Sequence, residues 1–318
     1  MSIIHYLRLA AATMLALIGL AQPAAAHEHP MSFDEMIEAL GWDFDATPIT
    51  TEQVGDNLYV LFGVGGNIAV SVGKDGVLIV DDQHPAMIPK VAEAIAGLGG
   101  GAVDFVVNSH WHFDHADGNI ALGEQGAWII SQINSRRMNR VDRSINLVGV
   151  GTYVQQAYPP HALADITFND LMQLHFNGER VDLLHFGPAH TSGDTATIFR
   201  GHNAVHFGDV FNAGYPFIDV DNGGSLDGMI AFCSAVLAQI DTDTVVIPGH
   251  GPVSTYADLE AYIEMLSAVR ERVAALIAEG KSLEQVVAAE PTKEFDQRYG
   301  SPASLLDRAY ASLGGAGG

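Results

Sequence analysis

The spacing of apolar residues changes along the chain, and each change predicts a different element. Residues 33–40 carry apolar side chains at helical spacing. Apolar runs follow at 58–62, 67–72 and 77–80, and the turn sequence Gly-Lys-Asp-Gly separates the last two. Runs of this kind, joined by short polar turns, are typical of strands. This part of the chain therefore predicts a short helix followed by an antiparallel meander.

Helical and strand spacing then alternate along the rest of the chain. A helical pattern from Ala86 ends at three glycines, and a strand expected at 103–107 leads into a histidine-rich segment. Further strands are expected at 128–130, 171–176, 181–186, 195–199, 204–207 and 244–247, and helices from about 131, at 225–239 and at 256–279. The long connection 144–165 is interpreted as a functional flap. This order favours two sheets sandwiched between helices.

Composition and charge narrow the class of protein. Of 318 residues, 48% are hydrophobic and 17% are charged, which excludes a disordered, collagenous or coiled-coil chain. The formal charge of -23 repels phosphate backbones, so no nucleic-acid partner is expected. The single cysteine, Cys233, can form neither an intramolecular disulfide nor a paired thiolate site, and its helical neighbours predict that it is buried. The sequence leaves the oligomeric state open.

The N-terminus is typical of an exported protein. Arg8 is the only charged residue before the apolar run Leu9–Ala21, and the small residues 24–26 follow as a cleavage site. We therefore predict a signal peptide at 1–26 and a periplasmic or secreted mature protein, with no stable membrane insertion after processing. An uncleaved anchor is the alternative, but the apolar run is shorter than the roughly 20 residues of a spanning helix.

The mature chain is predicted to hold one main domain. An N-terminal arm at 27–50 precedes the main domain at 51–280, and a helical extension at 281–318 follows, with no repeat or low-complexity linker between them. Cleavage after Ala26 would expose His27-Glu28-His29. A free amine with histidine in third position can wrap Cu(II) or Ni(II) in four nitrogens, so a copper site at the new N-terminus is a further hypothesis.

The histidines provide the strongest chemical signal. Four donor side chains fall within the six residues His110-Trp111-His112-Phe113-Asp114-His115, at the carboxyl end of the strand expected at 103–107. His110 and His112 project to the same side of an extended chain, and the other two donors lie at the following turn. Imidazole and carboxylate donors suit zinc. Scattered structural histidines are the alternative, and the close spacing argues against it.

This HxHxDH segment resembles that of the metallo-β-lactamase superfamily. Later segments occur in the order that the superfamily uses: Gly187-Pro188-Ala189-His190-Thr191, Phe207-Gly208-Asp209 and Pro248-Gly249-His250-Gly251. The resemblance spans roughly residues 50–265 and implies an α/β fold, a four-layer αβ/βα sandwich with metals in a groove at one edge of the sheets. It implies that His110, His112 and His190 hold one zinc ion. Asp114, His115 and His250 would hold a second zinc ion, with Asp209 bridging the two.

Individual positions narrow the branch of the family that the chain resembles. Flavodiiron oxidoreductases of this fold have a carboxylate where this chain has His112, so hydrolysis is favoured over diiron redox chemistry. Asp209 with His115 is similar to the ligand set of glyoxalase II and of lactonases, whereas cysteine-ligand β-lactamases have cysteine in place of Asp209. Asn222 resembles the asparagine that polarises the substrate carbonyl in those β-lactamases. The chain therefore has mixed features, and Asn222 is a candidate catalytic residue.

The resemblance implies a secreted binuclear zinc hydrolase, with iron or manganese as other candidate metals. A metal-bound hydroxide would attack the carbonyl of a small-molecule β-lactam, lactone, ester or thioester, and Asp114 would be the catalytic residue that orients it. Ser109 lacks a base outside the metal site and is not needed as a nucleophile. Two alternatives remain open: a mononuclear iron dioxygenase that uses His110, His190 and Asp209, and a non-catalytic metal-binding protein.

One position bears on the charge of the substrate. Cysteine-ligand β-lactamases resembling this chain usually have a lysine three residues after that ligand, where it pairs with the substrate carboxylate, and this chain has Asn212 there. The neighbouring side chains make the approach apolar: Phe211, Tyr215, Pro216 and Phe217. We therefore expect better turnover of uncharged esters or lactones than of β-lactams, unless a basic residue from 136–143, such as Arg140, replaces the lysine.

Overall fold

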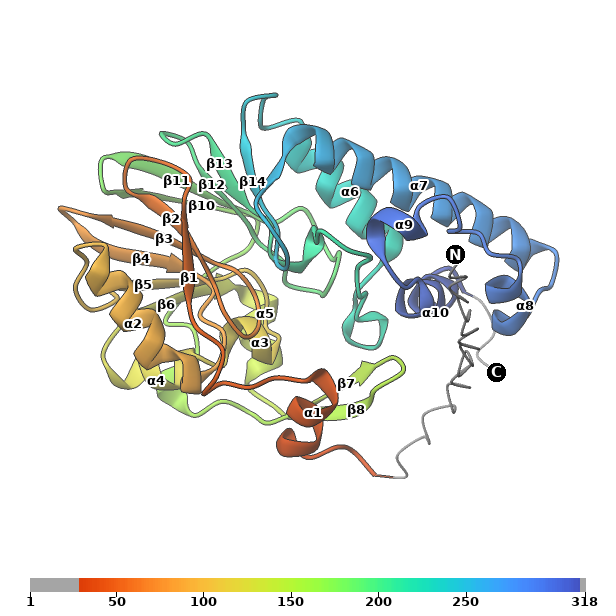
Figure 1. Cartoon of the computed structure of the whole chain (residues 1–318), viewed down its shortest axis with the longest axis horizontal. Coiled ribbons are helices and arrows are strands. Elements are labelled where there is room, and N and C mark those ends of the chain that lie inside the picture. The colour runs from red at the N-terminus through yellow and green to blue at the C-terminus, as the bar shows by residue number, and fades with distance from the viewer. Residues whose placement is uncertain (1–28, 315–318) are drawn as a thin grey trace, which may run out of the picture.

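Two β-sheets lie at the centre of the computed structural model, which describes residues 29–314 (Figure 1). The first sheet has the order β1-β2-β3-β4-β5-β6-β9. Its strands are β1 (Thr50–Gln53), β2 (Leu58–Phe62), β3 (Ile68–Gly73), β4 (Gly76–Val80), β5 (Phe105–Asn108), β6 (Trp128–Gln132) and β9 (Ile166–Phe168). Strands β2 to β4 form the predicted antiparallel meander, to which β1, not predicted, adds an antiparallel edge strand, and β4, β5, β6 and β9 are parallel.

The second sheet has the order β10-β11-β12-β13-β14-β15. Its strands are β10 (Leu171–Phe176), β11 (Glu179–Leu184), β12 (Ala196–Phe199), β13 (Ala204–His206), β14 (Val245–Ile247) and β15 (Ser254–Thr255). All neighbours are antiparallel except β13 and β14. Buried residues of both sheets, such as Val60, Val107, Leu183 and Ile247, pack into one apolar cluster, so the two sheets face each other across a shared core.

Helices cover the outer faces of both sheets. The first sheet packs against α2 (Ile88–Gly97) and α4 (Asn119–Glu124). The second packs against α6 (Leu226–Leu237) and α7 (Tyr256–Ala278), and the helices of the C-terminal extension, α8 (Leu283–Ala288), α9 (Asp296–Tyr299) and α10 (Ala303–Ser312), pack in turn against α7. These layers confirm the predicted αβ/βα sandwich, and the burial of Cys233 in α6 is confirmed as well. No helix within residues 29–314 is both long and apolar enough to cross a membrane.

The connection predicted as a flap contains a hairpin of its own. Strands β7 (Arg143–Leu147) and β8 (Gly151–Gln155) pair with each other, apart from both large sheets. Helix α1 (Phe33–Leu40), predicted from its apolar spacing, begins with a capping box at Ser32 and lies beside this hairpin (Figure 1). The backbone N–H of Met31 donates to the carbonyl of Thr152 at 2.7 Å. The N-terminal arm is therefore joined to the hairpin. The predicted signal peptide, and His27 and Glu28 of the copper hypothesis, lie outside the described residues.

Candidate metal centre

Seven predicted metal ligands come from loops that meet at one edge of the two sheets. His110 and His112 follow β5, and Asp114 and His115 lie on the short helix α3 (Phe113–Ala116). Asp209 follows β13, His250 follows β14, and His190 precedes β12, which runs antiparallel to β13. The carboxyl ends of neighbouring parallel strands share one edge of a sheet, so this topology gathers residues that are far apart in sequence.

The first group of donors consists of His110, His112 and His190, whose candidate ligand atoms all lie within 4.8 Å of one another. His190 Nε2 lies 2.9 Å from His112 Nδ1. The other nitrogen of the His190 ring, Nδ1, donates to the carbonyl of Phe217 at 2.8 Å. His110 Nε2 is buried and has no hydrogen-bond partner among the described residues. Three imidazole nitrogens thus face one small volume, an arrangement that fits a metal ion.

The second group consists of Asp114, His115 and His250, again with ligand atoms within 4.8 Å. His115 Nε2 lies 3.1 Å from His250 Nε2, and His250 Nε2 lies 3.1 Å from Asp114 Oδ2. Asp209 sits between the two groups, with Oδ1 3.1 Å from His115 Nε2 and Oδ2 3.9 Å from His190 Nε2. Its carboxylate is therefore positioned to serve both groups.

The predicted ligands differ in their ionisation. Burial opposes ionisation of Asp209, but the neighbouring His250 and His115 outweigh burial and hold the pKa of that carboxyl well below its usual value. Burial would lower the pKa of His250, yet Asp209 and Asp114 raise it to about 10. Burial and the adjacent imidazoles hold the pKa of His110 well below its usual value. The carboxylate of Asp209 and the imidazole of His110 are thus in the forms that bind metal. His250 must release a proton when a metal binds, and so must His115, whose pKa, despite burial, is also raised by the neighbouring carboxylates.

Glycines allow the loops to approach these ligands closely. A Cβ at Gly66, in the β2–β3 turn, would lie 2.2 Å from the ring of His115. A Cβ at Gly249 would lie 2.1 Å from Asp209 Oδ1. Asn67 ties the same turn to the loop that carries His250, because its amide donates to the carbonyls of Pro248 and Gly251 at 2.9 and 2.8 Å. These contacts hold the loops of both sheets together around the site.

Asp81 is a site residue that the sequence analysis missed. It directly follows β4, is fully buried and accepts three hydrogen bonds, two of them from Ser109: the backbone N–H at 2.6 Å and the hydroxyl at 2.7 Å. The third donor is His115 Nδ1 at 2.7 Å. Ser109 Oγ lies 3.0 Å from His110 Nδ1. One carboxylate thereby orients a histidine of each donor group, and Ser109 acts as a support rather than a nucleophile. The sequence signal for Asp81 was its position at the carboxyl end of β4, the strand next to β5.

Asn222 has a different environment from the one predicted. Its amide donates to both carboxylate oxygens of Asp219 at 3.0 and 2.9 Å and to the carbonyl of Ser144 at 2.9 Å. Asp219 Oδ2 in turn lies 2.9 Å from His112 Nε2, so Nδ1 of that ring faces the donor group. Asn222 is not among the residues that line the adjoining cavity. Its amide is occupied in holding Asp219 in this structure, and its contact with a substrate carbonyl stays a prediction.

Comparison with known sequences identifies the family. Residues 61–250, more than half of the chain, match the sequence model of the metallo-β-lactamase superfamily. The chain belongs to that superfamily. A hydroxyacylglutathione hydrolase from Polaromonas sp. is 30% identical over 165 residues, which make up 49% of this chain and 52% of that protein. The chain thus spans about half the length of the curated relative it matches.

Solved structures share the metallo-β-lactamase fold. The DIM-1 metallo-β-lactamase has a TM-score of 0.56 at 17% identity, with 69% of this chain and 97% of that chain covered. The sec-alkylsulfatase Pisa1 from Pseudomonas sp. has a TM-score of 0.64 at 15% identity, with 85% of this chain and 51% of that chain covered. At these identities the likeness concerns the fold alone.

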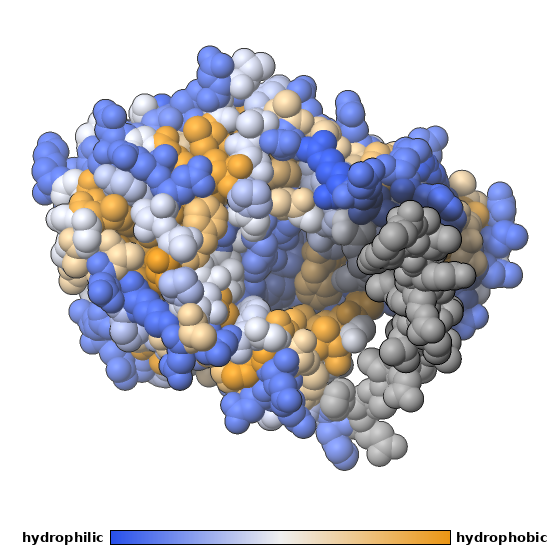
Figure 2. All heavy atoms as spheres, viewed as in Figure 1, coloured by the Kyte–Doolittle hydropathy of each residue, from blue (hydrophilic) through white to orange (hydrophobic). Residues whose placement is uncertain are grey.

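A cavity of about 360 Å³ opens beside the donor groups of this metallo-β-lactamase superfamily member. Four predicted ligands line it: His112, Asp114, Asp209 and His250. Most of its other walls are apolar, formed by Leu40, Trp42, Phe113, Ile145, Leu147, Tyr215 and Phe217. Figure 2 shows a hollow in this face of the molecule with hydrophilic residues at its floor and hydrophobic residues at the edge formed by α1 and the β7–β8 hairpin. The predicted flap thus contributes to the cavity wall.

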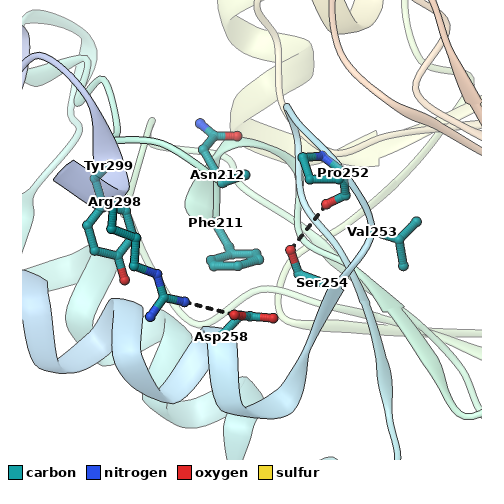
Figure 3. A pocket seen from close by; sticks show the side chains of 9 residues that line it. Phe211, Asn212, Pro252, Val253, Ser254, Asp258, Arg298 and Tyr299 are labelled. Atoms are coloured by element: carbon teal, nitrogen blue, oxygen red, sulfur yellow. Dashed lines mark hydrogen bonds and ion pairs between the residues drawn. The ribbon is translucent and has the colours of Figure 1, made fainter. Parts of the chain in front are cut away.

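No lysine or arginine is among the residues that line this cavity. Asn212 occupies the position discussed above, and its Oδ1 accepts a hydrogen bond from the backbone N–H of His250 at 2.8 Å. On the other side of Asn212 lies a second cavity of about 190 Å³, where Arg298 forms an ion pair with Asp258 at 2.8 Å (Figure 3). Arg140, the alternative cation, is exposed and lines neither cavity. The walls around the predicted ligands therefore provide a neutral amide in place of a cation.

Proposed function

We propose that this protein is an exported binuclear metal-dependent hydrolase that cleaves uncharged carbonyl compounds such as lactones, esters or thioesters. The observation that carries the proposal is the arrangement of seven donor side chains in two groups around Asp209. His110, His112 and His190 would hold one zinc ion, and Asp114, His115 and His250 the other. Nitrogen and oxygen donors also accept iron or manganese, so the metal is part of the test.

The chain's own residues orient the metal ligands and the attacking water. When bound, a pair of divalent cations lowers the pKa of water toward neutrality and polarises a carbonyl oxygen. Asp114 lines the cavity, and although burial opposes its ionisation, His115 and His250 hold the pKa of its carboxyl below the usual value. Its carboxylate is therefore ionised and can accept a hydrogen bond that orients the attacking water. Asp81 and Asp219 keep the imidazoles of His115 and His112 oriented.

The preference for uncharged substrates follows from the cavity. Charged groups bind poorly in an apolar cavity unless an opposite charge meets them. The only charged groups in the wall are the predicted metal ligands, because Asn212 is neutral and no lysine or arginine lines the cavity. A hydrogen bond to a charged group contributes about 1.5 to 3 kcal/mol, so a substrate that needs a cationic partner loses roughly 10- to 100-fold in binding. β-Lactams with a free carboxylate should accordingly be modest substrates.

A hydrolysis panel tests the proposed function. The protein, purified without added metal and analysed for zinc, iron and manganese, is then loaded with zinc and assayed on a neutral lactone, a thioester and a β-lactam. Wild type should hydrolyse the lactone or the thioester, His112→Ala should lose most of that activity, and His161→Ala, which changes an exposed histidine outside the site, should retain it. Iron as the bound metal with no hydrolysis would instead favour the dioxygenase alternative. Intact mass of the exported protein tests cleavage after Ala26.

A further inference from the structure

The N-terminal arm reaches the cavity through two side chains. Leu40, the last residue of α1, and Trp42 both line the wall, facing the side formed by the predicted metal ligands. The Trp42 ring packs against the ring of Phe113, with centroids 5.7 Å apart. Phe113 lies between His112 and Asp114 in the sequence. The arm is therefore in contact with the turn that carries two of the predicted ligands.

Two aromatic residues of the arm contact a histidine of the main domain. The His84 ring stacks against both Phe33 and Phe44, with centroid distances of 4.8 and 4.6 Å and interplanar angles of 15° and 21°, and the centroids of the two phenylalanine rings lie 6.3 Å apart. Phe44 also packs edge-on against Trp42 at 6.1 Å. This stack connects the wall residue Trp42 to the body of the domain, so the position of Trp42 depends on that of Phe44.

Lys90, on α2, fixes the loop that follows Trp42. Its ammonium group donates to the carbonyl oxygens of Phe44, Asp45 and Thr47 at 2.7, 2.7 and 2.8 Å. A lysine has three N–H donors, and here all three are used on one loop. Lys90 has no ion pair among the described residues, although the protein is strongly acidic. Because all three N–H groups of Lys90 donate to backbone carbonyls, this lysine fixes the conformation of the loop and does not neutralise a carboxylate.

We propose that the N-terminal arm is the specificity-determining wall of the cavity, with Leu40 and Trp42 contacting the apolar part of the substrate and Lys90 acting as the positioning residue that holds this wall in place. The inference rests on the proposed function and names the substrate class more closely. The preferred substrate is an uncharged carbonyl compound with an apolar chain or ring next to the scissile bond. Each CH₂ group buried against such a wall contributes about 0.8 kcal/mol, close to a fourfold gain in binding.

The test compares two lactones that differ in one apolar chain. The ratio of kcat/KM for γ-decalactone to that for γ-butyrolactone is measured with the zinc-loaded protein. Lys90→Met keeps the aliphatic stem and removes the donors, and Trp42→Ala removes the wall itself. We expect the ratio to fall about 10-fold in Trp42→Ala and about 3- to 10-fold in Lys90→Met, through a higher KM for the decalactone. Lys74→Met, at an exposed lysine in the β3–β4 turn, is the matched control and should keep the wild-type ratio.

A binding measurement separates this inference from the proposed function. Affinity for the neutral apolar dye N-phenyl-1-naphthylamine is followed by fluorescence and requires no turnover. If wild type does not hydrolyse lactones but Lys90→Met binds the dye more weakly than wild type, the proposed function is refuted and the role of the arm as the apolar wall of the cavity is supported. If wild type hydrolyses lactones but Lys90→Met keeps the wild-type ratio of kcat/KM values and the wild-type affinity for the dye, the inference about the arm is overturned. If Lys90→Met fails to fold, Leu40→Ala at the end of α1 provides the same comparison, and an unchanged ratio there would also overturn it.

Discussion

Asp81 offers a sharp test of how the two donor groups are supported, through the substitution Asp81→Asn. Oδ2 of this carboxylate accepts from the Ser109 hydroxyl and from His115 Nδ1, while Oδ1 accepts from the Ser109 backbone N–H. An asparagine amide has one oxygen and one NH₂ group, so in either orientation at least one donor loses its acceptor. The backbone should not change, because Asp81 has a φ of 65° and asparagine tolerates this left-handed conformation.

The size of the effect follows from the lost hydrogen bonds. A hydrogen bond to a charged group contributes about 1.5 to 3 kcal/mol, which corresponds to roughly 10- to 100-fold in metal affinity. Losses of that size are typical when a partner of a metal-bound histidine is removed. Asp81 contacts His115 directly and reaches His110 through Ser109, and even where the asparagine oxygen replaces Oδ2 both bonds lose their charged acceptor, so both sites should weaken in Asp81→Asn.

Zinc affinity, measured by competition with a chelating dye together with bound zinc per chain, provides the assay. The control is Asp219→Asn, because Asp219 supports His112 and should weaken only the site that contains that ring. Unchanged affinity in Asp81→Asn, or weakening confined to one site, would refute the reasoning that one carboxylate supports both groups.

Three further predictions concern the charge of the substrate, the role of Asp209 as a bridging ligand and the stability of the protein at acidic pH. Asn212→Lys should raise kcat/KM for a carboxylate-bearing β-lactam about 10- to 100-fold relative to a neutral lactone. No gain, with β-lactam turnover that is already efficient in wild type, would show that the carboxylate is held elsewhere. Asp209→Asn should weaken the second metal site more than the first, since a neutral amide bridges two cations poorly, and equal loss in a metal titration would contradict this. Burial lowers the pKa of His84 to about 4, so the stability of the neutral stacked ring is complete above about pH 6.5 and is lost as the pH falls toward 4. The melting temperature of wild type should therefore decline relative to that of His84→Phe over this range, and a constant difference would exclude the effect.

The sequence was sufficient for most of the fold. Apolar spacing predicted α1 and the meander β2 to β4 to within a residue or two, because these elements bury one regular face. The pattern at 144–165 predicts a flap but not the hairpin β7–β8, since the two strands pair only with each other and carry little alternation. Very short strands such as β9 and β15 were also missed, because they owe their conformation to a neighbouring strand rather than to their own pattern.

The candidate site was predicted unevenly. The donor residues could be named because each lies in a short, recognisable motif, and the structure brings all seven together. The partners that orient them could not, because Asp81 and Asp219 lie 34 and 107 positions away from the histidines they contact. The sequence likewise does not indicate that the amide of Asn222 donates to Asp219. The wall supplied by Trp42 depends on the path of the arm, which spacing does not determine.

The central claim is that two metal ions at this site perform hydrolysis. The most direct measurement follows turnover of a neutral lactone while the metal-free protein is titrated with zinc. The account predicts no turnover without metal, a plateau at two zinc ions per chain, loss of activity in His112→Ala and retention in His161→Ala. Full turnover by the metal-free protein, or by His112→Ala at any zinc concentration, would contradict it.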